Sequence, residues 1–140
     1  MARSQEILEG LKKQLGYNDA QWELWKSNPK NMEVIAKMEE FGKYKVVAEV
    51  INAYGCAMEH KVGDKLIFSG LGGFVSKEPP GQVCVGALGP VLPFVGMVLH
   101  KIAEGIDPQK IIFNRVRCTD VGVENGGWGE VLMEVRVEKT

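Results

Sequence analysis

Apolar residues recur every three or four positions through roughly the first forty residues, which is the period of amphipathic helices. In the first such segment they are Ile7, Leu8, Leu11 and Leu15. We predict three helices in this part of the chain. The first ends at Gly16, the second is capped by Asn18 or Asp19, and the third begins at Pro29 and continues to Gly42.

The period of the pattern changes to two at Lys43, which predicts a strand over residues 43–51 with at least one buried face. The remaining strands are expected at 65–68, 110–118 and 130–138. Residues 69–82 are rich in glycine and proline, so we expect an irregular surface loop there. A second glycine-rich stretch, residues 124–129, is expected to form a hairpin loop between the last two strands.

Residues 83–99 contain no charged side chain and belong to a predicted helix over about 85–104 that ends at Gly105. This uncharged segment is shorter than the roughly 20 residues that cross a bilayer, and it contains glycines and prolines. We therefore expect a buried central helix and no membrane association. Because the helix is apolar on all sides, it should be covered by the sheet on one face and by the N-terminal helices or a second subunit elsewhere. This favours a homo-oligomer.

These elements predict an α+β fold in which the N-terminal helices and one central helix pack on a small, mainly antiparallel β-sheet. We expect residues 1–42 to form an N-terminal helical segment and residues 43–140 to form the α+β core, within a single domain overall. The length of 140 residues, with 45% hydrophobic and 25% charged residues, is typical of such a globular protein.

The formal net charge is −1, and the basic residues are spread along the chain without a clustered basic stripe. This argues against nucleic-acid binding. The chain begins Met-Ala-Arg-Ser-Gln-Glu without an apolar signal segment. Its three cysteines are an odd number and too widely spaced for the disulfide framework of a secreted domain. A cytoplasmic location with free thiols is therefore expected.

Candidate chemistry is concentrated in the cysteines and one histidine. Cys56 and Cys118 each lie at the end of a predicted strand, Cys84 lies at the start of the central helix, and His60 follows Cys56 after three intervening residues. Strand ends and a helix start can meet at one edge of a sheet. Three cysteines and one histidine are a standard tetrahedral ligand set for zinc. We therefore predict a metal site made of Cys56, His60, Cys84 and Cys118, with zinc preferred over iron.

Two other interpretations of the cysteines stay open. Free cysteines often serve as small buried apolar residues, although Cys56 and His60 lie in a turn and not on an apolar stripe. Alternatively, the dipole of the central helix favours a reactive thiolate at Cys84, with His60 or His100 as its base. His100 is more simply interpreted as a surface residue near the C-terminal end of the helix.

Between Tyr44 and Val137 the chain resembles a family of small uncharacterised prokaryotic proteins. The shared features are a Cys-x3-His-Lys-Val-Gly-Asp turn from Cys56, a Pro-Gly-x-x-Cys stretch that opens a helix at Cys84, and the late cysteine Cys118. The family has glycine before the histidine and proline after the helix cysteine, where this chain has Glu59 and Val85. The N-terminal helices lie outside its shorter members. The resemblance implies that Cys56, His60, Cys84 and Cys118 form one site, and it implies no activity.

The sequence thus favours a small cytoplasmic metal-binding domain that serves as a subunit or accessory protein of a larger enzyme system. We expect a closed zinc site with four protein ligands, which would hold the fold together. The first alternative is a stand-alone enzyme that uses the metal or Cys84 on a hydrophobic small molecule beside the central helix. The second is a structural homo-oligomer with buried thiols. Whether the chain is an enzyme is left open.

Overall fold

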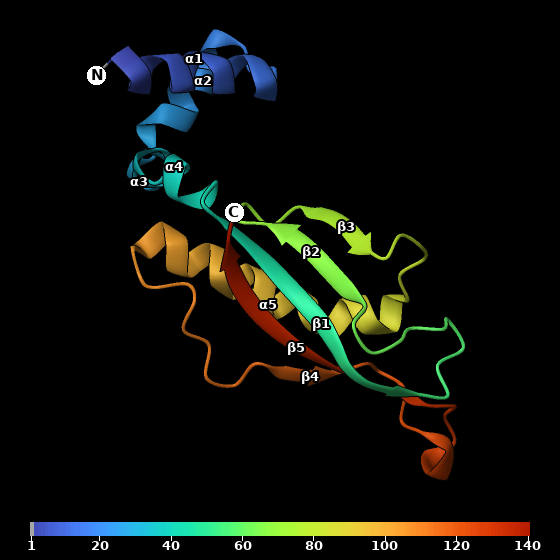
Figure 1. Ribbon diagram of the computed structural model, residues 1–140. Coiled ribbons are helices and arrows are strands. Elements are labelled where there is room, and N and C mark those ends of the chain that lie inside the picture. The colour runs from blue at the N-terminus through green and yellow to red at the C-terminus, as the bar shows by residue number, and fades with distance from the viewer. Residues whose placement is uncertain (1) are drawn as a thin grey trace. The chain divides into compact units, whose positions relative to one another are not determined.

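The computed structural model describes residues 2–140, which form two compact units that meet in sequence between Glu40 and Phe41. The first unit is helical (Figure 1). Its helices, the last of which ends one residue past the unit boundary, are α1 (Ala2–Leu15), α2 (Asp19–Ser27), α3 (Pro29–Ala36) and α4 (Met38–Phe41). Helices α1 and α2 both pack against α3.

The predicted helix boundaries of this unit are present in the structure. The Asn18 side chain accepts the Gln21 backbone N–H at 2.8 Å, and the Gln21 side chain accepts the Asn18 backbone N–H at 3.0 Å. This reciprocal pair is a capping box. Pro29 occupies the first turn of α3, whose cap is Asn28. One difference is that the predicted third helix is interrupted at Lys37, so that α4 is a separate short helix.

The second unit contains a five-stranded antiparallel sheet with the order β3-β2-β1-β5-β4. Its strands are β1 (Tyr44–Tyr54), β2 (Lys65–Ser69), β3 (Phe74–Glu78), β4 (Arg115–Arg117) and β5 (Glu130–Lys139). The two longest strands, β1 and β5, pair from Tyr44 opposite Lys139 to Tyr54 opposite Glu130 and form the centre of the sheet. The α+β fold class with its antiparallel sheet is confirmed. The packing of the N-terminal helices on this sheet stays a prediction.

Two segments of the sheet differ from the prediction. Strand β3 lies inside the expected irregular loop, because a glycine turn lets Ser69 donate its backbone N–H to the Gly73 carbonyl at 2.8 Å and start a hairpin. Strand β4 is only three residues long, although a strand was predicted over 110–118. In that segment Phe113 is 89% exposed and does not pair with β5, so apolar residues alone did not determine strand pairing.

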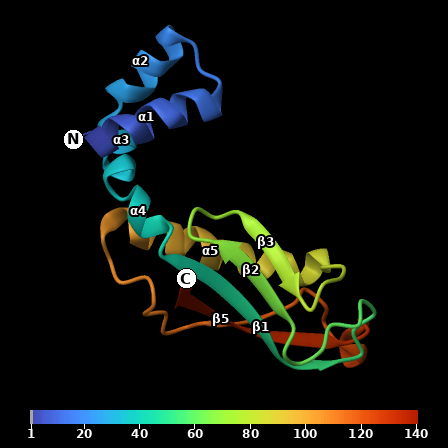
Figure 2. The same ribbon diagram turned by 45° about the horizontal axis from the view of Figure 1, so that its top comes forward.

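Helix α5 (Val85–Glu104) lies along one face of the sheet (Figures 1 and 2). It buries one stripe, which consists of Ala87, Val91, Val95, Val98 and Ile102. The facing strand β5 contributes a buried residue at every second position, namely Val131, Met133, Val135 and Val137. These two periodic rows form the core that positions the start of α5 at one end of the sheet.

The expectation that α5 is buried on all sides does not hold for the second unit on its own. Val85 is 83% exposed, and Leu92 and Met97 are also exposed, because the sheet covers only one face of the helix. Within residues 2–140, α5 is also the one helix long and apolar enough to cross a membrane by length and composition. One such helix is weak evidence for a membrane span, and 28% of the 18-residue window that meets the criterion is buried in the structure.

Candidate functional site

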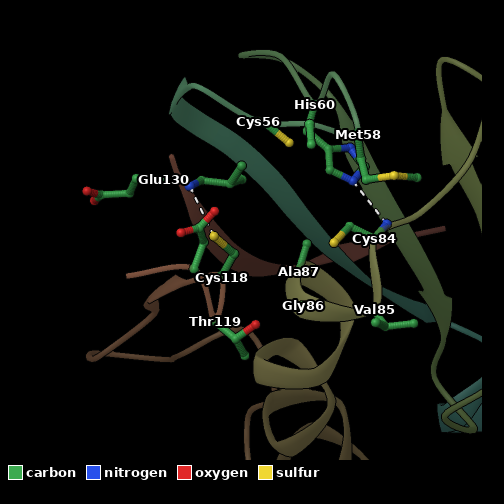
Figure 3. Close-up of a pocket in the computed structure, with 13 residues that line it drawn as sticks. Cys56, Met58, His60, Cys84, Val85, Gly86, Ala87, Cys118, Thr119 and Glu130 are labelled. Atoms are coloured by element: carbon green, nitrogen blue, oxygen red, sulfur yellow. Dashed lines mark hydrogen bonds between the residues drawn. The ribbon is translucent and has the colours of Figure 1, made fainter. Parts of the chain in front are cut away.

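All four residues singled out in the sequence line one pocket at the N-terminal end of α5 (Figure 3). Cys56 follows β1, Cys84 is the N-cap of α5, Cys118 follows β4, and His60 lies in the loop between β1 and β2. The cavity has a volume of about 360 Å³. The apolar part of its wall is formed by Ala57, Met58, Val85, Ala87 and Val131. We call it the three-cysteine pocket.

The three thiols are free and half-buried, and their sulfur atoms reach the cavity from different sides (Figure 3). Two hydrogen bonds to the backbone of Val131 in β5 hold Cys118, one through its own backbone and one through its sulfur. Its N–H donates to the Val131 carbonyl at 2.9 Å, and its Sγ accepts the Val131 N–H at 3.3 Å. The thiol of Cys118 is therefore placed by the sheet itself.

The cysteines are not arranged around a single ion. Within residues 2–140, no three side chains of histidine, cysteine, aspartate or glutamate stand close enough together to hold one metal ion. A zinc ion needs its ligands within about 2.0–2.3 Å of the metal. The predicted zinc site therefore stays a prediction, and it would require the three cysteine segments to move closer together.

His60 is buried, and both of its ring nitrogens face protein groups. Nε2 accepts the backbone N–H of Cys84 at 3.1 Å, and Nδ1 lies 3.5 Å from a carboxylate oxygen of Asp64. A neutral histidine that accepts at Nε2 carries its proton on Nδ1, which then points to Asp64. In this arrangement His60 positions the Cys84 segment and offers no free lone pair to a metal.

Asp64 links His60 to Lys77 of β3, and we call these three residues the buried polar triad. The Lys77 ammonium lies 3.4 Å from the same oxygen of Asp64, and Asp64 also accepts the Lys61 backbone N–H at 3.2 Å. Burial raises the pKa of Asp64, but the Lys61 N–H, the Lys77 charge and the His60 imidazole outweigh it and hold that pKa below its usual value of 3.8. The hydrophobic pattern gives no sign of Lys77 in this site, because it does not predict β3.

The loop after Cys118 is organised by Asp120. Its carboxylate accepts the backbone N–H groups of Gly122, Trp128 and Gly129, each at 3.0 Å. These three N–H groups hold the pKa of Asp120 below its usual range. A side chain at Gly129 would collide with the Tyr54 carbonyl, so only glycine fits there. The loop is therefore a compact structure that closes one side of the pocket.

A close contact joins this loop to α5. Thr119 donates its N–H to the Gly86 carbonyl at 3.0 Å, and a Cβ at Gly86 would lie 2.6 Å from Thr119 Oγ1. The absence of a side chain at Gly86 thus lets the Cys118 segment approach the first turn of α5. Glu59, next to His60, has a φ of 61°, a left-handed conformation that favours glycine. His100 is exposed and does not line the three-cysteine pocket.

No protein-family model, curated protein or solved structure matches this chain.

Proposed function

We propose that the three-cysteine pocket binds a thiophilic metal centre, and that this chain serves as a metal-binding subunit or accessory protein of a larger enzyme system. One observation supports this most directly. Three unpaired cysteines from three distant segments, at Cys56, Cys84 and Cys118, line the same cavity. Soft thiolates are the ligands that select zinc, Cu(I) and iron–sulfur centres.

The surroundings of the thiols favour this proposal over purely packed cysteines. A cysteine that only fills space lies in a close-packed core without a cavity. Here the thiols instead border a cavity, and His60 and Val131 connect two of the three segments to the rest of the pocket by hydrogen bonds. Such second contacts orient metal ligands in known sites.

The acidic and basic side chains of the pocket favour binding over catalysis. The two nitrogens of His60 face Cys84 and Asp64, and Asp120 is held by backbone N–H groups. Glu130 faces Arg117 at 3.7 Å. The three titratable side chains that line the pocket beside the thiols, His60, Asp120 and Glu130, are therefore each engaged with another group.

A second candidate function is supported by the shape of the pocket. A volume of about 360 Å³ with a mainly apolar wall falls within the usual range for small-molecule sites, roughly 300–1,000 Å³. In this alternative, Cys84 acts as a nucleophile on a hydrophobic small molecule, with the N-terminus of α5 stabilising negative charge.

Metal analysis of the full chain, purified without a histidine tag and without oxygen, tests the proposal. We expect metal in the wild type and its loss in Cys56→Ser, Cys84→Ser and Cys118→Ser. Met58→Leu is the matched control, because it removes a sulfur atom of the same pocket that we do not assign as a ligand. If the wild type binds no zinc, Cu(I) or iron even after reconstitution, the metal proposal is wrong. Labelling of Cys84 by a small apolar electrophile would then favour the second candidate.

A further inference from the structure

Resting on the proposed metal-binding function, we infer that the centre is a four-iron iron–sulfur cluster held by Cys56, Cys84 and Cys118, with its fourth iron free of a cysteine ligand. The size of the cavity is the first observation. The described residues do not gather three ligands around one ion, yet three thiols border a single cavity of about 360 Å³. A group that binds each thiolate through a different metal atom therefore suits three thiols around one cavity better than a single ion does.

The number of thiols distinguishes between cluster types. A two-iron cluster is ordinarily bound by four protein ligands, two on each iron. In a four-iron cubane each thiolate binds one corner iron, so three cysteines hold three corners. His60 does not supply the fourth ligand here, because its Nε2 accepts the Cys84 N–H and its Nδ1 faces Asp64. Asp120 is held by backbone N–H groups and Glu130 faces Arg117, so the fourth iron would take an external ligand, such as a small molecule or a group of a partner protein.

The electrostatics of the pocket suit an anionic cluster. Each thiol loses its proton when it binds iron, so a 2+ cubane with three thiolates carries a net negative charge. The Cys118 sulfur already accepts the Val131 N–H, and hydrogen bonds to cluster sulfurs are a known control of reduction potential. The cavity also lies at the N-terminus of the 20-residue helix α5, where the helix dipole stabilises negative charge.

The wall of the cavity is mainly apolar. Its lining includes Ala57, Ala87 and Val131, and apolar groups around a metal centre influence its reduction potential. Of the charged groups near His60, the Lys77 ammonium and the Asp64 carboxylate lie 3.4 Å apart. Lys77 is therefore paired with Asp64, and it does not line the cavity.

Anaerobic reconstitution of the full chain with iron and sulfide tests this inference. We expect about four irons and about four acid-labile sulfides per chain, as a four-iron cluster requires, together with an electron paramagnetic resonance signal after reduction with dithionite. Each cysteine-to-serine variant should lose most of the bound iron, whereas Met58→Leu should retain it. Circular dichroism separates loss of the cluster from loss of the fold in these variants.

The wild type alone provides a second measurement. Mild oxidation with ferricyanide should release the iron that lacks a cysteine and leave a three-iron cluster with its own magnetic signal. The possible outcomes separate this inference from the proposed function. If zinc or Cu(I) binds in a cysteine-dependent manner but iron and sulfide do not, the cluster is excluded and the metal-binding function stands. If none of these binds, both proposals are wrong.

Discussion

Replacement of Asp64 by alanine tests whether the buried polar triad stabilises the candidate site. The carboxylate accepts the Lys61 backbone N–H and faces both the Lys77 ammonium and the His60 ring. Without it, the Lys77 charge stays buried without its partner, and His60 loses the group toward which its Nδ1 points. Since His60 in turn accepts the Cys84 N–H, the change should also loosen the segment that positions Cys84.

The expected destabilisation follows from the burial of this triad. The side chains of Lys77, Asp64 and His60 are only 10%, 9% and 2% exposed. Breaking a buried ion pair by removing one partner costs about 3–5 kcal/mol. We expect the lower end, about 3 kcal/mol, because the 3.4 Å separation is long for a charge-assisted hydrogen bond. For a unit of about 100 residues this corresponds to a fall in Tm of roughly 12–24 °C.

Urea and thermal unfolding, followed by circular dichroism, measure this effect. Glu134→Gln is the matched control, because its partner Arg115 is 60% exposed and such pairs contribute less than about 1 kcal/mol. Lys77→Met made in the Asp64→Ala background should recover part of the lost stability, since the buried charge is then absent. An Asp64→Ala midpoint that falls no further than that of the control would refute a stabilising role for the triad.

Three further outcomes are expected. Because the folded pKa of Asp64 lies below its usual 3.8, its stabilisation is fully present above that pH and is lost as the pH falls through the lower folded value. The difference in unfolding free energy between the wild type and Asp64→Asn should therefore be largest above pH 3.8 and shrink below it, so that Asp64→Asn gives the flatter acid limb. Gly86→Ala should destabilise the protein by about 1–3 kcal/mol, because the new Cβ collides with Thr119. Gly89→Ala in the same helix meets no atom within 4 Å and should stabilise the protein by about 0.5–1 kcal/mol. Equal effects of the two substitutions in chemical unfolding would contradict this. Glu59→Gly should stabilise the protein by up to about 1 kcal/mol in the same assay, because glycine adopts the left-handed conformation of residue 59 without steric strain. A loss of stability would show that the contacts of the Glu59 side chain outweigh this strain.

The sequence alone determined the elements whose signals are local. The bounds of α5 were predicted closely, because the uncharged stretch of residues 83–99 defines its body and Gly105, which adopts the left-handed C-cap conformation, ends it. Strand β5 was equally clear, since its apolar residues alternate on one buried face. The cap of α2, predicted at Asn18 or Asp19 and found at Asn18, and the proline that begins α3 are likewise short-range signals. The α+β class followed from the order of these elements.

Tertiary structure decided what depends on contacts between distant segments. Strand β3 forms because β2 is available to pair with it, and this pairing brings Lys77 to Asp64. The sequence named the cysteines as one site but could not give their separation, because backbone register and side-chain direction set how closely thiols approach. It also predicted His60 as a ligand, whereas the fold directs its Nε2 to the backbone of Cys84. Hydrogen-bond partners of a buried ring are chosen by three-dimensional packing, which residue spacing along the chain does not encode.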